Sequence, residues 1–138
     1  MALPDKLKPT ALTSLTTGIS NQTIANGASF TGSEIDNTSN RYSLMAVEVE
    51  WSYSTAPTAN KTVELQIKEA LDGTNYEDTA RTIAAFSPSA DTTSHRLVLL
   101  SEYPLVADKF KLVLKNTDTG QTITATVRAW GYDMAVED

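Results

Sequence analysis

Residues 41–53, RYSLMAVEVEWSY, decide the class of fold. From Met45 onward every second side chain is large and apolar, while small or acidic side chains stand between them. Successive side chains of a β-strand point to opposite faces, so this pattern predicts a strand with one dry and one wet face. The dry face carries Met45, Val47, Val49, Trp51 and Tyr53. Such a strand needs a second layer of structure to cover its dry face.

Other segments show related patterns. Residues 62–69, 109–115 and 122–132 alternate in the same way, and residues 28–35 and 79–86 are expected to be shorter strands. The proximity of 41–53 and 62–69 predicts that these two strands pair as a hairpin. Residues 96–100, RLVLL, form a continuous apolar run that is typical of a strand covered on both faces.

These strands, separated by turn-rich segments and without helical periodicity, predict an all-β protein. The expected architecture is an antiparallel β-sandwich of the jelly-roll or immunoglobulin-like kind, spanning residues 29–138. Twenty threonines among 138 residues suit strands with wet outer faces. Residues 1–28 contain Pro4 and Pro9 and are rich in Thr, Ser and Asn, so we expect an extended N-terminal arm there.

Composition excludes several functions. The net charge of −6 argues against direct binding of DNA or RNA, which depends on clustered Lys and Arg. The absence of cysteine excludes disulfides, thiolate metal sites and a cysteine nucleophile. No apolar run is long enough for a signal peptide or a membrane span, so no membrane partner is expected.

The residues that most often carry catalysis are sparse. His95 is the single histidine, and no motif supplies a nucleophile or an orienting acid for it, so we interpret it as structural. Glu48 and Glu50 lie on the wet face of their strand and are interpreted as solvated. Residues 72–78, DGTNYED, lack the ligand spacing of a calcium loop and predict a turn. We therefore expect no enzyme activity, no metal and no cofactor.

Two surface features are better candidates for binding. Trp130 shares the wet face of its strand with threonines, so Trp130 and nearby Tyr132 could form an exposed aromatic contact for sugar rings or a protein, or could simply pack against a loop. Lys109, Lys111 and Lys115 form a basic stripe. Lysines on an edge strand discourage aggregation, and they could also meet an acidic partner.

Turn and strand signatures resemble those of one class of proteins. They are the Thr-rich opening that leads to Asn26 and Gly27, LDGTNY at 71–76, and YPL at 103–105 followed by FKLVLKN at 110–116. Over residues 22–132 the chain resembles small β-sandwich virion structural proteins of tailed bacteriophages. The resemblance implies a head decoration or cement protein that is made in the host cytoplasm and binds the major capsid protein, or other virion proteins, on the head surface.

The resemblance also implies a homo-oligomer, with a trimer favoured. Intersubunit contacts are expected in the arm and in the apolar segment 97–106, at Leu3, Leu7, Leu12, Leu97, Leu99, Tyr103 and Leu105. Two alternatives stay open. One is a tail- or neck-associated virion protein, and the other is a carbohydrate- or receptor-binding module of the same architecture.

Overall fold

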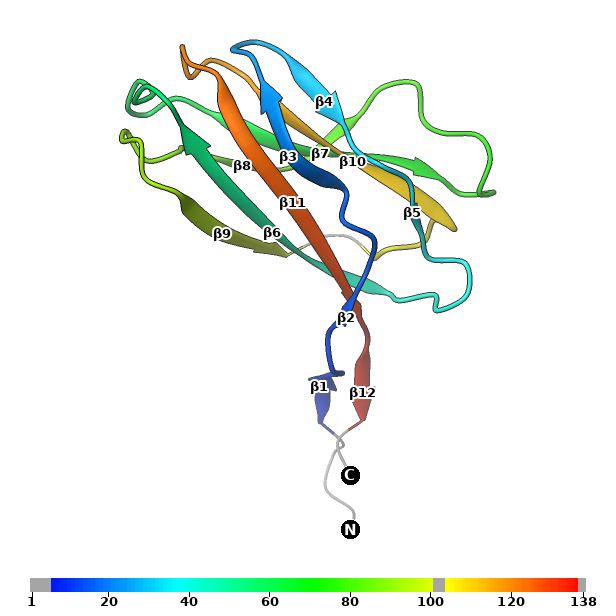
Figure 1. The fold of residues 1–138 in the computed structure, drawn as a ribbon. Coiled ribbons are helices and arrows are strands. Elements are labelled where there is room, and N and C mark those ends of the chain that lie inside the picture. Colours follow the sequence, from blue (N-terminus) through cyan, green and yellow to red (C-terminus); the bar gives the residue numbers. More distant parts are fainter. Residues whose placement is uncertain (1–5, 101–103, 137–138) are drawn as a thin grey trace.

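A computed structural model describes residues 6–100 and 104–136, and it consists of two β-sheets packed face to face with a two-stranded ribbon at one end (Figure 1). The strands are β1 (Leu7–Pro9), β2 (Thr13–Ser14), β3 (Ile19–Ile24), β4 (Ser29–Thr31), β5 (Ile35–Asp36), β6 (Leu44–Tyr53), β7 (Val63–Ala70), β8 (Arg81–Phe86), β9 (His95–Leu100), β10 (Lys109–Asn116), β11 (Ile123–Tyr132) and β12 (Met134–Val136). Within the described residues there is no helix with the length and apolarity that a membrane crossing needs.

Each sheet has five strands, and all of its pairings are antiparallel. The first, here called the β10 sheet, has the order β4-β10-β7-β8, with β5 also beside β10. The second, the β11 sheet, has the order β2-β11-β6-β9, with β3 also beside β11. This arrangement confirms the predicted all-β, antiparallel sandwich.

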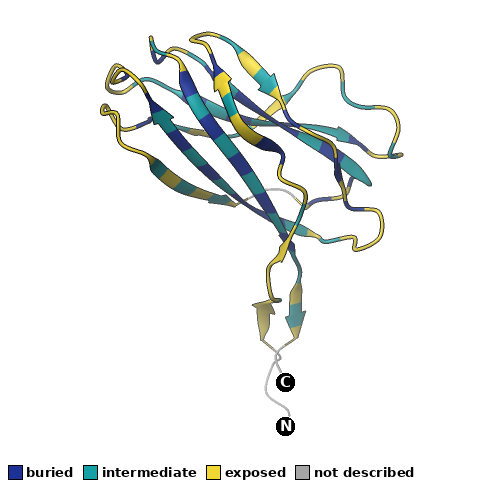
Figure 2. Ribbon diagram, in the orientation of Figure 1, coloured by how far each residue is buried: buried dark blue, intermediate teal, exposed yellow. Residues whose placement is uncertain are grey.

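The core lies between the sheets and is made of the dry faces that the alternation predicted. Val49, Leu65, Phe110 and Val127 are each 0% exposed, and Trp51 is 5% exposed. Figure 2 shows buried positions alternating with more exposed ones along β6 and β11. Burial of these apolar side chains is the main favourable contribution to folding.

The predicted hairpin of residues 41–53 and 62–69 is wrong. Strand β6 lies in the β11 sheet, whereas β7 lies in the β10 sheet. Each strand has one dry face, and in a sandwich the two dry faces meet across the core instead of lying side by side in one layer. Residues 54–62 therefore carry the chain from one layer to the other.

Part of the expected N-terminal arm lies inside the sandwich. Strand β3 pairs with β11, and its end residues Ile19 and Ile24 are 1% and 2% exposed. The segment between them is polar, so the sequence shows no alternation of apolar residues that would predict this strand. The expected strand at 28–35 is split into β4 and β5, with Gly32 between them. A Cβ at Gly32 would overlap the Gly18 carbonyl oxygen, so only glycine allows this close approach.

Candidate functional site

The outer face of the β11 sheet carries aromatic, apolar and charged side chains in adjacent rows. The strand register places Trp130 of β11, Ala46 of β6 and Leu100 of β9 in one row. The next row contains Arg128, Glu48 and Val98 in the same strand order. Trp130 lies on the wet face that the alternation assigned to it, and both Trp130 and Tyr132 are partly buried there. Their role as an exposed aromatic contact stays a prediction.

Ion pairs occupy the middle of this face. Arg128 Nη1 lies 3.0 Å from Glu48 Oε1, and Arg96 Nη2 lies 2.8 Å from Glu50 Oε2. The sequence placed Glu48 and Glu50 correctly on the wet face but did not show their partners, because cross-strand neighbours depend on which strands pair. Each carboxylate is thus held by a guanidinium from a neighbouring strand.

Strand β9 forms a free edge of this sheet and pairs within the described residues only with β6. Its burial alternates, so the predicted cover on both faces is wrong. Leu97 and Leu99 pack against the core, whereas Val98 and Leu100 on the outer face are 63% and 61% exposed. An apolar run can be read as a fully buried strand, but at a sheet edge one of its faces stays open to solvent.

The terminal ribbon, formed by β1 and β12, projects from one end of the sandwich (Figure 1). Its register pairs Leu7 with Val136 and Pro9 with Met134, and these two pairs share one face because side-chain direction alternates. Leu7, Met134 and Val136 are 64%, 43% and 51% exposed. The ribbon therefore presents a wholly apolar face to solvent.

The predicted contact residues occupy different environments. Leu7 and Leu12 are 64% and 57% exposed, as a contact surface requires, but Leu105 is 6% exposed and belongs to the core. Leu97 and Leu99 face inward, and Leu3 and Tyr103 lie outside the described residues. Their role in intersubunit contacts stays a prediction.

The other exposed large apolar side chains are Leu71, Val98, Leu100, Val106, Met134 and Val136. Val98, Leu100 and Val106 lie in the segment 97–106 where contacts were expected, whereas Met134 and Val136 were not predicted. The alternation within residues 96–100 could have indicated Val98 and Leu100 if β9 had been recognised as an edge strand. Nothing in the sequence indicated that β1 and β12 pair.

His95 is held between an acid and the core. Its Nε2 lies 2.7 Å from Asp91 Oδ1, and its ring centroid lies 5.6 Å from that of Trp51. The hydrogen bond with His95, followed by one from the Thr93 backbone N–H, lowers the pKa of Asp91. The pair fastens the preceding loop to the start of β9, which agrees with the structural role predicted for His95.

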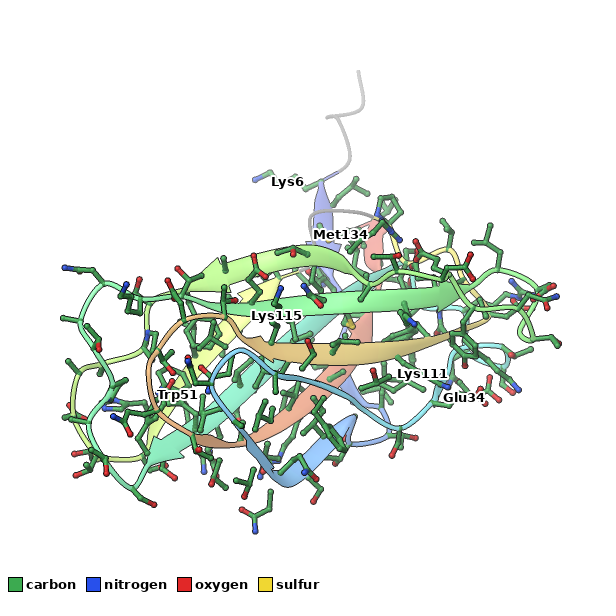
Figure 3. The ribbon with its side chains drawn as sticks, turned by 90° about the horizontal axis from the view of Figure 1, so that it is seen from above. Lys6, Glu34, Trp51, Lys111, Lys115 and Met134 are labelled. Carbon is green, nitrogen blue, oxygen red and sulfur yellow. The ribbon has the colours of Figure 1, made fainter. Side chains whose placement is uncertain are left out.

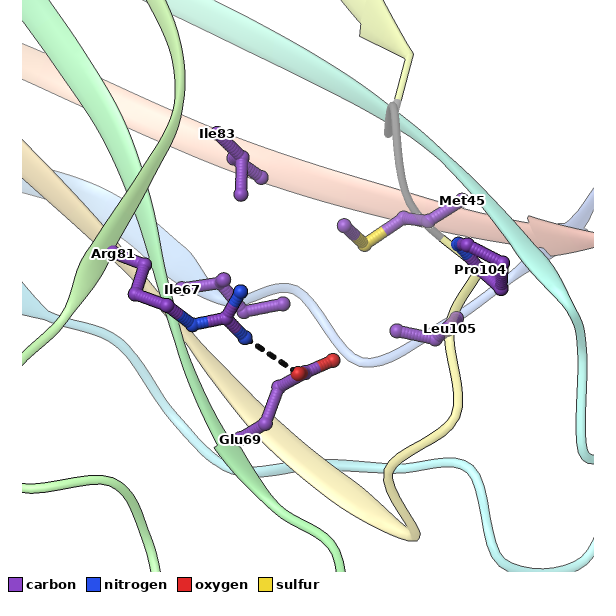
Figure 4. Close-up of a pocket in the computed structure, with 7 residues that line it drawn as sticks. All are labelled: Met45, Ile67, Glu69, Arg81, Ile83, Pro104 and Leu105. Atoms are coloured by element: carbon purple, nitrogen blue, oxygen red, sulfur yellow. Dashed lines mark hydrogen bonds and ion pairs between the residues drawn. The ribbon is translucent and has the colours of Figure 1, made fainter.

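A small, partly open cavity lies between the sheets. It has a volume of about 30 Å³, which is room for one water molecule rather than for a sugar or a cofactor. Figure 4 shows its lining residues, Met45, Ile67, Glu69, Arg81, Ile83, Pro104 and Leu105. Arg81 Nη2 and Glu69 Oε2 are joined at 2.6 Å, so the charged groups at this cavity already satisfy one another.

A wider and more open hollow of about 300 Å³ lies at the turn between β7 and β8. The carboxylates there are used by the protein itself. Asp72 Oδ1 accepts hydrogen bonds from the backbone N–H groups of Thr74 and Asn75, and Glu77 binds Arg81 at 2.7 Å. The described residues contain no group of three or more His, Asp or Glu side chains arranged to hold a metal ion.

The basic stripe lies on the outer face of β10, which is an interior strand of its sheet. Its lysines therefore do not protect a sheet edge, as the sequence suggested they could. Lys111 Nζ lies 4.4 Å from the centre of the Tyr76 ring, and the Tyr76 hydroxyl donates to Glu34. Lys109 pairs with the same carboxylate at 3.4 Å. Figure 3 shows Lys111 and Glu34 near the same end of the sheet, whereas Lys115 lies farther along it.

No family model matches the chain, and neither does any curated protein sequence. Among solved structures, the chain is similar to one from infectious bursal disease virus Gx strain, with 10% identity, a TM-score of 0.52, and coverage of 94% of this chain and 32% of that chain. It is similar to dimeric latent PorU from Porphyromonas gingivalis at 11% identity and a TM-score of 0.51, covering 93% of this chain and 12% of that chain.

A carbohydrate-binding module from Cellvibrio mixtus lichenase 5A, solved with cellotriose, matches at 12% identity and a TM-score of 0.48, with 86% of this chain and 88% of that chain covered. The chain thus spans about a third of the virus chain and much less of PorU. At such identities the likeness concerns the path of the backbone. The likeness therefore shows only a β-sandwich fold, shared with a chain from the infectious bursal disease virus structure and with part of PorU.

Proposed function

We propose that this chain is a non-enzymatic structural protein of a tailed-bacteriophage virion that decorates the head by binding the major capsid protein. The observation that carries the proposal is the terminal ribbon, which presents its apolar face outside the sandwich. The sequence resemblance over residues 22–132 supports a place in a bacteriophage virion, and the likeness of fold to a virus chain agrees with such a place.

A short ribbon of this kind requires a partner. Isolated two-stranded β-structures are marginally stable in water, and this one has three residue pairs. Burying a Leu, Val or Met side chain contributes about 1.5–3 kcal/mol. Burial of Leu7, Met134 and Val136 against a capsid surface would therefore offset the entropy lost when the ribbon is held in one conformation.

Binding to heads that lack the protein tests the proposal. Purified protein is added to such heads, and the bound fraction is measured after sedimentation through a density gradient. We expect wild-type protein to sediment with heads and Leu7→Lys to lose at least tenfold in apparent affinity, because a charge replaces an apolar contact.

Leu71→Lys provides a matched control, since Leu71 is 67% exposed, close to the 64% of Leu7, but lies at the β7–β8 turn. It should bind as the wild type does. A wild-type protein that stays free of heads, or a Leu7→Lys variant that binds them equally well, would contradict the proposal.

One observation favours a second function, the binding of a carbohydrate. Trp130 lies on the same outer face as the Arg128–Glu48 ion pair. An aromatic ring beside a charged pair can stack on a sugar ring while the polar groups bind its hydroxyls. Calorimetric titration with oligosaccharides tests this function: binding by the wild type that is lost in Trp130→Ala supports it, and no binding by the wild type removes it.

A further inference from the structure

Strand β9 is the least protected sheet edge in the described structure. It pairs with β6 over six consecutive residues, without a bulge. The opposite edges of both sheets are made of short strands or of β3, whose pairing with β11 contains a register shift. Strand β8 also pairs through a register shift. Bulges, short strands and charges are the usual devices that keep sheet edges from pairing with other chains.

The residues of β9 favour the pairing of this edge with a strand of another chain. After Arg96 come four apolar residues, and two of them, Val98 and Leu100, are more than 60% exposed on the outer face. Unpaired backbone groups of an edge strand bind an added strand through main-chain hydrogen bonds, and the side chains select which strand is accepted.

We propose that β9 pairs antiparallel with β9 of a second copy of this chain, about a two-fold axis at Val98. A two-fold axis perpendicular to the sheet keeps the outer faces of both copies on the same side. It places Val98 opposite Val98 of the second copy and Leu97 opposite Leu99 of the second copy. The same strand therefore supplies a partner of matching length in which apolar residues meet apolar residues.

The remaining pair, Arg96 opposite Leu100 of the second copy, is compatible with this register. The Arg96 guanidinium is held by Glu50 of its own chain at 2.8 Å, so its charge stays satisfied. Its aliphatic stem is then available to cover the leucine. Residues 96–100 supply the whole register, and all of them lie in the described part of the chain.

The size of the contact decides its strength. A six-residue strand is about 20 Å long, and two packed sheets with their outer side chains are about 20 Å thick. Side-by-side contact then buries about 800 Å² in total, which is less than the ~1,200 Å² of stable interfaces. We therefore expect a dimer that forms as concentration rises, in place of the trimer that the sequence resemblance favours. This contact does not depend on the proposed head-binding function.

Cysteine cross-linking tests the register, because the chain has no cysteine of its own. In the proposed pairing the two Cα atoms of residue 98 are about 4.5–5.5 Å apart, within the range that a disulfide bridges. The two copies of residue 100 are about 14 Å apart, beyond that range. Val98→Cys should form a disulfide-linked dimer under mild oxidation, and Leu100→Cys should not.

The two cysteine variants are matched, since Val98 and Leu100 are similarly exposed on the same strand face. Equal cross-linking of both, preferential cross-linking of Leu100→Cys, or cross-linking of neither would overturn the proposal. Sedimentation equilibrium supplies a second measurement that needs no cysteine. Wild-type protein should associate with rising concentration, and Val98→Lys should weaken this association at least tenfold.

Leu71→Lys should associate as the wild type does, because Leu71 follows β7, which belongs to the β10 sheet, whereas β9 belongs to the β11 sheet. A wild type that stays monomeric at millimolar concentration, or a Val98→Lys variant that still dimerises, would contradict the edge pairing. The Leu7→Lys variant separates this inference from the proposed function. It should dimerise normally while failing to bind heads, so either result can fail without the other.

Discussion

At the scale of single residues, Asp72 shows how a local sequence signal becomes a measurable property. Asp72 and Gly73 begin the turn after β7, and Gly73 has the positive φ of 77° that this turn requires. The backbone N–H of Asn75, then its side chain and the backbone N–H of Thr74, bind the Asp72 carboxylate and lower its pKa to about 2. The sequence predicted this turn from the Asp-Gly pair alone.

We predict that Asp72 titrates near pH 2 in the folded protein, which NMR of its carboxyl carbon across a pH series can measure. Because the pKa is lower folded than unfolded, the ionised turn stabilises the fold above about pH 4. That contribution is lost as the pH falls toward 2. A midpoint at the ordinary value of 3.8 would show that these hydrogen bonds do not form in solution.

At the scale of elements, the dry and wet faces were predictable while the pairing of strands was not. Trp51 was placed in the core from the alternation along β6, and the structure confirms it. The hairpin of β6 with β7 was wrong, since the neighbours of β6 are β9 and β11, far from it in sequence. Cross-strand contacts such as Arg128 with Glu48 depend on those neighbours and could not be predicted.

The Arg128–Glu48 pair should couple β11 to β6 weakly. A double-mutant cycle with Arg128→Ala and Glu48→Ala, measured by urea unfolding, should give a coupling energy of about 0.2–1 kcal/mol that decreases with added salt. The more exposed pair Lys61–Asp118, at 3.9 Å, serves as the control and should give a smaller value. Equal coupling energies in both cycles would mean that the position of Arg128 and Glu48 within the sheet does not strengthen their ion pair.

At the scale of the whole molecule, the N-terminal segment has two roles. Its first part forms the terminal ribbon with β12, and its later part, β3, completes the β11 sheet. Composition suggested one continuous arm because Pro, Thr and Asn run through the segment. Only the packing of Ile19 and Ile24 into the core divides it.

Two truncations should behave differently. Removal of residues 1–9 together with 134–138 should leave a cooperatively folded sandwich, because the exposed ribbon adds little to the core. Removal of residues 1–24 should unfold it. Losing a buried isoleucine costs about 2–5 kcal/mol, so losing Ile19 and Ile24 approaches the ~5–15 kcal/mol stability of a typical domain.

Thermal unfolding followed by circular dichroism measures both truncations, with the full chain as reference. A folded protein after removal of residues 1–24 would show that β3 is dispensable. Loss of folding after the shorter truncation would show instead that the ribbon is part of the cooperative unit.

The sequence by itself determined the class of the fold, the wet and dry faces of its main strands and the shortage of catalytic groups. These properties follow from side-chain direction along a single strand and from composition, so no distant contact is needed to predict them. Tertiary structure alone decided which strands share a sheet, that β9 is an open edge, and that residues 7–9 and 134–136 pair in a ribbon. Each of these depends on contacts between residues far apart in the sequence, which local periodicity does not encode.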